Sequence, residues 1–296
     1  MKNYTSYDLI EWGKPFEKSQ HALPEPTLSE VLIRVTAAGL CHSDLHVQKG
    51  YMDLGEEGRL TFAERGAQLP MTFGHEIAGI VEAVGDKVKN VSIGQQVLVF
   101  PWIGCGDCLA CHENRESDCS AMRIIGLKQK GGFATHCLIE NEKFLVNIDG
   151  LDAADVVPHA CSGITVYNAL EKIGPLRDGE WLAVMGCGGL GLNAIAIARA
   201  MGFDNIIGID IDNSKLDAAR QMGASKTLNS KSANAVADLQ KFAESRLMAV
   251  IDTFGGESTG QLAVRTLAKS GQYLLVGQAG GDFKMPQVWL PQKAMT

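Results

Sequence analysis

The sequence lacks the features of a membrane protein, a secreted protein or a nucleic-acid-binding protein. No stretch approaches the ~20 consecutive apolar residues of a membrane span. The start, MKNYTSYDLIEWGKPF, shows no positively charged segment followed by an apolar one, as a secretory signal would. Lys and Arg number 27 against 34 Asp and Glu, so the net charge is −7, and like charges never form a run. Phosphate-rich partners require a basic surface. We therefore expect a cytoplasmic protein that binds neither membrane nor nucleic acid.

Internal repeats and low-complexity tracts are also missing, and the composition is that of an ordinary globular protein, with 46% hydrophobic and 21% charged residues. At 296 residues the chain is long for one domain and comfortable for two. Short apolar or alternating runs, separated by glycines and polar turns, fill the first half at 30–37, 76–84, 95–100 and 133–139. Such a pattern is typical of a barrel or sandwich.

The second half changes rhythm, because predicted strands alternate with predicted helices. The strands are expected at 181–185, 205–210, 226–229, 248–254 and 272–277, and the helices at 190–201, 214–222, 232–245 and 257–268. This alternation indicates βαβ units and a parallel, doubly wound sheet. The fold class is therefore α/β, and we expect a β-rich domain over 1–155 and the doubly wound domain over 156–296.

Residues 50–69 are polar, charged and poor in strand signals. A loop of this length inside a domain is usually functional or mobile. A lid and a solvated surface excursion are both open interpretations.

The sequence contains eight cysteines, four of which lie within fifteen residues: Cys105, Cys108, Cys111 and Cys119. Disulfides are rare in the cytosol, so clustered cysteines indicate a metal site or redox thiols. Four thiolates close together can surround a tetrahedral zinc ion and leave no position open for chemistry, which predicts a structural site. The spacing matches neither common ferredoxin pattern, and no thioredoxin-like βαβ unit surrounds these cysteines.

Three further candidate ligands are dispersed along the chain, namely Cys41, His75 and Cys161. Two thiolates and one imidazole leave a fourth zinc position open, which is the pattern of a catalytic zinc. Each residue alone would more often be a packing residue, and sequence spacing does not by itself bring them together.

A glycine-rich turn, Gly186-Cys187-Gly188-Gly189-Leu190-Gly191, follows a predicted strand and precedes an apolar helix. Gly186 permits a tight turn, Gly188 lets the backbone approach a pyrophosphate, and Gly191 allows close packing of helix and strand. The next strand ends in Asp210, whose carboxylate can accept from ribose hydroxyls and would repel a 2′-phosphate. The turn predicts binding of NAD rather than NADP, with a glycine turn that binds no nucleotide as the alternative.

The run G-H-E-x-x-G from Gly74 to Gly79, the four-cysteine loop and the dinucleotide turn, in this order, resemble the zinc-dependent medium-chain alcohol dehydrogenases. The resemblance covers nearly all of the chain. It implies a GroES-like catalytic domain followed by a Rossmann domain, with the active site in the cleft between them. It also implies a structural zinc on the four clustered cysteines and a catalytic zinc on Cys41, His75 and Cys161. Glu76 is implied as an alternate ligand or a group just behind the ligands.

The resemblance further assigns roles to single residues. Ser43 matches the hydroxyl that contacts the substrate oxygen, and His46 the end of that proton relay. His42 matches a residue that faces the pyrophosphate, Thr165 one that contacts the nicotinamide, and Lys215 a lysine near the adenosine ribose. Asp44 is expected to orient a ligating histidine.

The implied activity is hydride transfer between NAD and a small primary or secondary alcohol, or its aldehyde or ketone, with two zinc ions per chain. A polyol dehydrogenase is the first alternative, although such enzymes usually lack the complete four-cysteine loop. A non-catalytic nucleotide-binding relative is the second, but it need not retain Cys41, Ser43, His75 and Cys161 together. Family members continue beyond the point matching Thr296 and form homodimers or homotetramers, so we expect a truncated form whose full-length version oligomerises.

Overall fold

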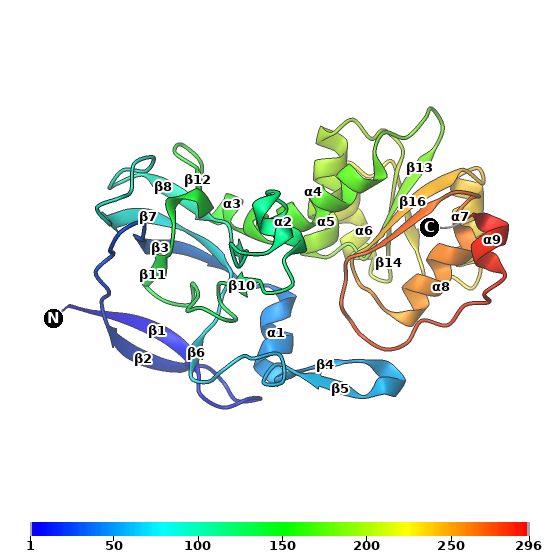
Figure 1. Cartoon of the computed structure of the whole chain (residues 1–296). Coiled ribbons are helices and arrows are strands. Elements are labelled where there is room, and N and C mark those ends of the chain that lie inside the picture. The colour runs from blue at the N-terminus through cyan, green and yellow to red at the C-terminus, as the bar shows by residue number, and fades with distance from the viewer. Residues whose placement is uncertain (1, 295–296) are drawn as a thin grey trace. The chain divides into compact units, whose positions relative to one another are not determined.

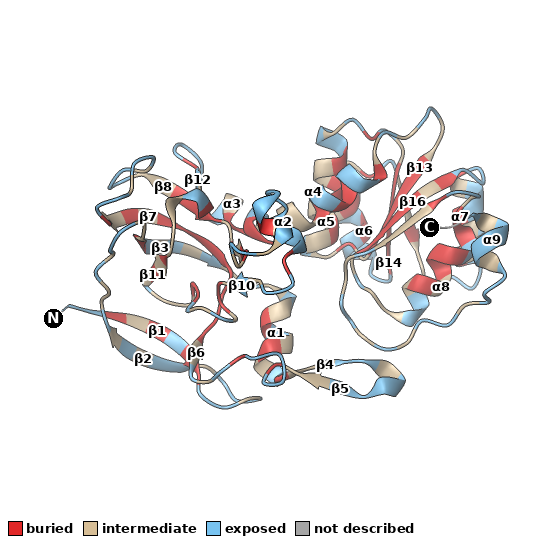
Figure 2. Cartoon of the chain, viewed as in Figure 1, coloured by how far each residue is buried: buried red, intermediate tan, exposed pale blue. Residues whose placement is uncertain are grey.

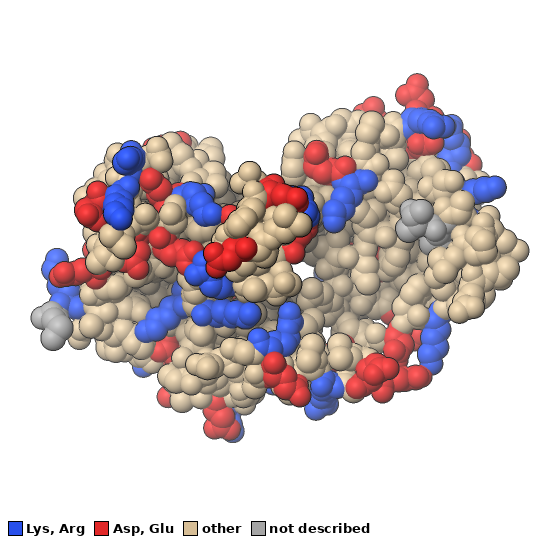
Figure 3. All heavy atoms as spheres, in the orientation of Figure 1, with Lys and Arg blue, Asp and Glu red and all other residues tan. Residues whose placement is uncertain are grey.

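The computed structural model describes residues 2–294 (Figure 1). The backbone divides into two units. The first comprises Met1–Met52 and Leu60–Cys161, and the second comprises Asp53–Arg59 and Ser162–Thr296. On the face shown in Figure 3, Lys and Arg side chains are interspersed with Asp and Glu side chains. Among the described residues, no helix is long and apolar enough to cross a membrane.

The first unit is built around a five-stranded antiparallel sheet of order β11-β3-β7-β8-β12, beside a three-stranded sheet of order β2-β1-β6 and a two-stranded β10-β9 pair. The longest pairing joins β3 (Val31–Gly39) to β7 (Glu76–Val84). Their inward residues, such as Ile33 and Ile77, are fully buried, since alternate β-branched side chains face one core. The remaining elements of this unit are β1 (Asn3–Leu9), β2 (Glu17–Ala22), α1 (His42–Lys49), β6 (Met71–Thr72), β8 (Gln96–Val99), β9 (Trp102–Ile103), α2 (Leu109–His112), β10 (Arg123–Ile124), β11 (His136–Ile139), β12 (Leu145–Asn147) and α3 (Ala153–Val156).

The second unit contains a parallel five-stranded sheet of order β15-β14-β13-β16-β17. Its central strand β13 (Trp181–Met185) is buried throughout (Figure 2). Leu182 and Val184 pack with one core cluster, and Trp181, Ala183 and Met185 pack with another. Helices α4 (Ser162–Ile173), α5 (Gly189–Ala200) and α6 (Asn213–Gln221) contribute to the first cluster, and α7 (Ala235–Phe242) and α8 (Glu257–Thr266) to the second. The sheet is therefore doubly wound, with helices on both faces.

The strands β14 (Ile206–Asp210), β15 (Lys226–Asn229), β16 (Leu247–Asp252) and β17 (Gln272–Leu275) complete this sheet, and a short helix α9 (Trp289–Lys293) follows. Every strand and helix predicted in the second half is present, within a few residues of its expected ends. The alternation of apolar strands with amphipathic helices was sufficient to predict these elements. Because helices cover both faces of the sheet, its central strands are continuous apolar runs that are easily recognised in the sequence.

The segment 50–69 differs from the expected loop. It contains a two-stranded hairpin, β4 (Tyr51–Asp53) and β5 (Arg59–Thr61), and the tip between them clusters with the second unit. There the Glu56 N–H donates to Asp282 Oδ2 at 2.8 Å. Three-residue strands made mostly of polar residues carry too short a pattern for alternation to be recognised.

A buried carboxylate supports the N-terminal sheet. Asp8 in β1 is 3% exposed and accepts from Thr72 Oγ1 at 2.6 Å and from His21 Nε2 at 2.8 Å. Burial alone would raise the pKa of Asp8, but the hydrogen bonds from Thr72 and His21 outweigh it, and the pKa lies below its ordinary value.

We expect Asp8→Asn to lower the free energy of unfolding by about 1–3 kcal/mol near neutral pH, because it weakens charge-assisted hydrogen bonds in a buried place. A carboxyl with a lowered folded-state pKa stabilises the fold above its unfolded pKa, and this contribution is lost as pH falls through the folded value. The difference from wild type should therefore shrink as the pH falls from about 5 to about 3, measured by urea unfolding. Asp86→Asn, at an exposed turn, is the control. A difference that stays constant over this range would contradict the assignment.

Candidate metal and cofactor sites

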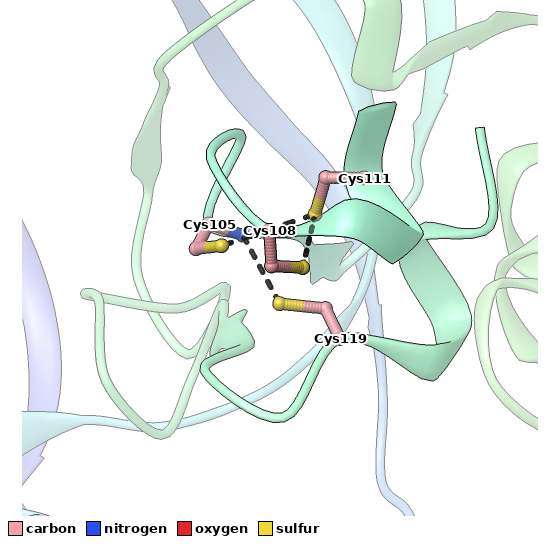
Figure 4. A group of neighbouring side chains, drawn as sticks. All are labelled: Cys105, Cys108, Cys111 and Cys119. Carbon is pink, nitrogen blue, oxygen red and sulfur yellow. Dashed lines mark hydrogen bonds between the residues drawn. The ribbon is translucent and has the colours of Figure 1, made fainter. Parts of the chain in front are cut away.

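The four clustered cysteines converge on one point in the first unit (Figure 4). Their sulfur atoms all lie within 4.8 Å of one another. Cys108 Sγ is 3.5 Å from Cys111 Sγ, and Cys105 Sγ is 4.0 Å from Cys111 Sγ. Tetrahedral zinc with Zn–S bonds of about 2.3 Å requires sulfur separations of about 3.8 Å. The four thiols thus fit a zinc ion with all positions filled by protein.

Local backbone supports this cluster. A side chain at position 104 would meet Cys111 Sγ at 2.7 Å, so Gly104 leaves the space that the sulfur occupies. The N–H of Cys105 donates to Cys119 Sγ at 3.3 Å. The backbone N–H groups of Asp107 and Cys108 lower the pKa of Cys105 to about 6. A thiol held near its thiolate form by backbone donors is ready to bind a metal.

The dispersed candidates also converge. The ligand atoms of Cys41, His75, Glu76 and Cys161 lie within 4.8 Å of one another, although 120 residues separate the two cysteines. Cys41 caps the start of α1, His75 and Glu76 lie at the start of β7, and Cys161 follows the 3₁₀ turn Val157–Ala160. The two sulfur atoms are 3.9 Å apart, the separation that a shared tetrahedral zinc requires.

His75 provides the most direct test of this fit. Its Nδ1 lies 3.4 Å from Asp44 Oδ1, while its Nε2 is buried without a hydrogen-bond partner. In the part of the chain that the structure describes, only one other buried side-chain polar atom, Ser6 Oγ, lacks a partner. A carboxylate on one imidazole nitrogen and a metal on the other is a common arrangement of ligating histidines. An imidazole with an unpartnered nitrogen and a ligand atom within 4.8 Å of two thiols therefore fits a zinc ligand.

The protonation states of these groups are strongly perturbed. The hydrogen bond between the two thiols lowers the pKa of Cys41 to about 3 and raises that of Cys161. Burial, followed by the negative charge of Cys41, raises the pKa of Glu76 to about 7. Burial alone would lower the pKa of His75, but Asp44 and Cys41 raise it to about 10. Negative charge thus accumulates where a divalent cation would neutralise it.

Glu76 occupies its place because the facing residue has no side chain. A Cβ at Gly39 would lie 1.9 Å from Glu76 Oε2. Gly39 pairs directly with Glu76 across β3 and β7. Sequence reasoning named Glu76 but not Gly39, whose importance depends on the strand register.

Ser43 in α1 and Trp102 in β9 lie beside this cluster, and His42 and His46 follow Cys41 in α1. Ser43 Oγ lies 3.5 Å from Cys41 Sγ. The imidazole rings of His42 and His46 lie on the same face of α1, with centroids 5.0 Å apart. Burial, then the positive charges of His42 and Lys49, lower the pKa of His46. The Trp102 ring lies 6.0 Å from the His75 ring, beside the candidate zinc ligands.

The glycine turn in the second unit has the expected geometry. Gly186 adopts φ +86°, a conformation that favours glycine. Added Cβ atoms at Gly188 and Gly189 would meet nothing within 4 Å, so the backbone there is open to an approaching group. A Cβ at Gly191 would lie 1.8 Å from the Gly186 carbonyl oxygen. With Gly188 as the N-cap and no side chain capping α5, the helix start fits a pyrophosphate.

Asp210 lies at the end of β14 and is buried. Its carboxylate accepts from the backbone N–H groups of Cys187 and Ile211, both at 2.7 Å, and of Asp212 at 2.9 Å. Sequence reasoning gave Asp210 only a ribose-binding role. Its hydrogen bond to Cys187 shows that it also holds the glycine turn.

The remaining cofactor candidates lie on helices of the second unit. Thr165 in α4 lines a cavity of about 370 Å³ together with Asn168, Lys172, Leu275 and Val276. Lys215 is exposed in the first turn of α6. The two cysteines without an expected role, Cys137 and Cys187, are buried, and burial raises the pKa of each to about 12. Each packs in a hydrophobic core cluster.

Two metal-binding clusters in one unit and a dinucleotide turn in the other define a zinc-binding dehydrogenase. The family model of the alcohol dehydrogenase GroES-like domain matches residues 27–150, and that of the zinc-binding dehydrogenase matches residues 189–296. The chain belongs to the zinc-dependent medium-chain alcohol dehydrogenase family. It is therefore a zinc-dependent oxidoreductase with a GroES-like domain followed by a Rossmann domain, which confirms the predicted fold class.

Relatives support this assignment over most of their length. The chain is 39% identical over 279 residues to an NAD-dependent alcohol dehydrogenase of Sulfurisphaera tokodaii, covering 93% of this chain and 79% of the relative. It is 38% identical over 277 residues to one of Saccharolobus solfataricus, covering 93% and 78%. The crystal structure of an alcohol dehydrogenase from Aeropyrum pernix superimposes with a TM-score of 0.88 at 26% identity, covering 98% of this chain and 83% of that one.

We expect two populations of zinc that differ in lability. The four-cysteine site is closed, whereas the Cys41, His75 and Cys161 set leaves an exchangeable position, so a mild chelator should remove the second zinc first. Metal analysis, activity and circular dichroism should be followed together. Activity should fall with the first zinc lost while the fold persists. At most one zinc per intact chain would show that one of the two sites is wrongly assigned.

Proposed function

We propose that this chain is an NAD-dependent alcohol dehydrogenase that interconverts a primary or secondary alcohol and its aldehyde or ketone. The observation that carries the proposal is the convergence of two thiols and the His75 imidazole, whose Nε2 has no hydrogen-bond partner. A set of three protein ligands leaves one coordination position for a substrate oxygen. The names of the two archaeal relatives, both NAD-dependent alcohol dehydrogenases, support the same activity.

In this proposal Cys41, His75 and Cys161 hold the catalytic zinc, and Glu76 is an alternate ligand that can exchange with substrate. The four clustered cysteines hold a structural zinc. When bound, zinc acidifies the alcohol and NAD accepts the hydride. Asp44 orients His75 through its Nδ1 and accepts from the N–H of Cys41 at 2.9 Å, so one buried carboxylate positions two ligands.

Ser43 and His46 are proposed to carry away the alcohol proton. The Ser43 hydroxyl lies 3.5 Å from the Cys41 sulfur, so it would lie near a substrate oxygen at the open zinc position. The lowered pKa of His46 keeps its imidazole neutral at pH 7, and a neutral imidazole can accept a proton. The geometry thus supports a path from the substrate through the hydroxyl to a base on the same helix.

NAD is proposed to bind the glycine turn from Gly186 to Gly191, including the Gly189 and Leu190 N–H groups at the start of α5. Asp210 would accept from the ribose and repel a 2′-phosphate. Lys215 near the adenosine ribose, Thr165 at the nicotinamide and His42 at the pyrophosphate complete the proposed contacts, with catalytic and cofactor-binding domains over 1–155 and 156–296.

The substrate, compartment and assembly belong to the proposal as well. A small alcohol or carbonyl compound is the expected substrate. A D-arabinose dehydrogenase of Sulfolobus solfataricus superimposes with a TM-score of 0.86 at 27% identity over 100% of this chain and 87% of that one, so polyols and sugars should be assayed. Eight free thiols suit the reducing cytoplasm. A homodimer or homotetramer is the proposed assembly. A substrate panel with NAD and with NADP, followed by nicotinamide absorbance, tests the activity.

Ser43→Ala should reduce turnover by about 10²–10⁴-fold, because the alcohol proton loses its first acceptor. Zinc content and NADH binding should stay unchanged. His46→Gln should reduce turnover less and should remove the acid limb of the pH profile, since only neutral imidazole accepts a proton. In wild type, that limb should lie below pH 6.5, the ordinary pKa of histidine. A Ser43→Ala variant with wild-type turnover would remove Ser43 from the mechanism.

Asp210→Ser should weaken NAD by a few kcal/mol, the scale of losing charge-assisted hydrogen bonds of ~1.5–3 kcal/mol each. NADP should weaken less than NAD, because the repulsion of a 2′-phosphate is gone, while the loss of the hydrogen bond to the Cys187 N–H affects both cofactors. Fluorescence titration with NADH and NADPH measures the ratio of the two dissociation constants. A wild-type protein that already prefers NADPH would overturn the assignment of Asp210.

A further inference from the structure

The glycine turn in the second unit has little to hold its own shape. Gly188 and Gly189 have no side chains, and no side chain caps α5. Glycine loses more conformational freedom on folding than any other residue. A turn of this composition binds an anion well only if groups outside it fix the direction of its N–H groups.

Three hydrogen bonds from neighbouring strands supply this restraint. From β14, Asp210 accepts the Cys187 N–H at 2.7 Å, and the Ile209 carbonyl accepts the Gly186 N–H at 2.8 Å. From the end of β16, on the other side of β13, the Thr253 hydroxyl lies 2.8 Å from the Gly186 carbonyl oxygen and 2.9 Å from that of Met185. The sequence did not suggest a functional role for Thr253.

Thr253 lies in a firmly held segment. Its own N–H donates to the Met185 carbonyl at 2.9 Å. The buried Asp252 accepts from the N–H groups of Phe254 and Gly255 at 3.0 and 2.8 Å, and from the Tyr273 hydroxyl at 2.8 Å. The hydroxyl that restrains the turn is therefore fixed by strands β16 and β17.

The packing around Gly186 makes its carbonyl direction important. A Cβ at Gly191 would lie 1.8 Å from the Gly186 oxygen and 3.2 Å from Thr253 Oγ1. The carbonyl, the hydroxyl and the first turn of α5 thus occupy one tightly packed corner. If the Gly186 oxygen rotates, the first turn of α5 must move, and the N–H groups that start the helix move with it.

We propose that Thr253 is a positioning residue for the dinucleotide, whose hydroxyl locks the Gly186 carbonyl and so holds the glycine turn in its phosphate-binding shape. The residue needs no contact with the cofactor. The inference rests on the proposed NAD-binding function of the turn. It adds a specific source of pre-organisation, because the ordering cost is met within the cofactor-free protein.

The test compares three variants of the zinc-loaded protein. Thr253→Val keeps the shape and removes the donor, and Thr253→Ser restores a hydroxyl. Thr266→Val is the matched control in the same unit. Thr266 is more deeply buried than Thr253, which is partly buried. The Thr266 hydroxyl donates to the carbonyls of Leu262 and Ala263 at 2.7 and 3.2 Å, within α8 and away from the turn. The readouts are melting temperature, NADH dissociation constant by fluorescence titration, and hydrogen exchange of the amides from 187 to 192 without cofactor.

We expect Thr253→Val to raise the NADH dissociation constant about three- to tenfold, the scale of one neutral hydrogen bond. It should also speed exchange of the turn amides, and Thr253→Ser should restore both. Thr266→Val should lower the melting temperature as much as Thr253→Val does. It should change the NADH dissociation constant less than about twofold. Equal NADH affinity in Thr253→Val and wild type would overturn the role of Thr253. Failure of the wild-type protein to bind NADH would instead refute the proposed function, so the two failures are distinguishable.

Discussion

The buried cluster of Cys41, Cys161, His75 and Asp44 is the constraint on which the first unit depends. Negative charge and an unpartnered imidazole nitrogen are held together in a largely buried place. Groups of this kind are costly to bury unless a cation compensates them. The β3–β7 pairing serves this cluster directly, because Gly39 opposite Glu76 places Cys41, two residues further on, beside His75.

In the second unit, too, strand register positions the groups of the proposed site, which here would bind an anion. Parallel pairing brings the carboxyl ends of β13, β14 and β16 into register, with Met185 beside Ile209 on one side and Asp252 on the other. Ligands of open α/β sheets bind at these strand ends. The glycine turn follows Met185 directly. Asp210 ends β14 and Thr253 follows β16, so their side chains reach the turn from its two sides. A flexible turn is thereby held by two rigid neighbours.

Most of this architecture was predictable from the sequence where the signal is local. Strand and helix alternation gave the doubly wound sheet, and the four cysteines gave their own metal cluster because one loop contains all of them. The contact between Cys41 and Cys161 was not predictable from spacing, since it depends on where two distant segments meet. The family resemblance supplied that pairing. The roles of Gly39, Thr253 and the Asp210–Cys187 hydrogen bond were not predictable from the sequence either, because each depends on strand register.

The difference between the two metal sites follows from how each is assembled. One loop can supply four sulfur ligands at small entropic cost, and it then encloses the ion completely. A site assembled from α1, β7 and the 3₁₀ turn before Cys161 requires the sheet to form first, so its ligands are set by tertiary register. Such a site can stop at three firm ligands, because the sheet rather than the metal holds them in place. The position left open is then available to a substrate oxygen, which explains why the proposed chemistry belongs to the dispersed cluster rather than to the local one.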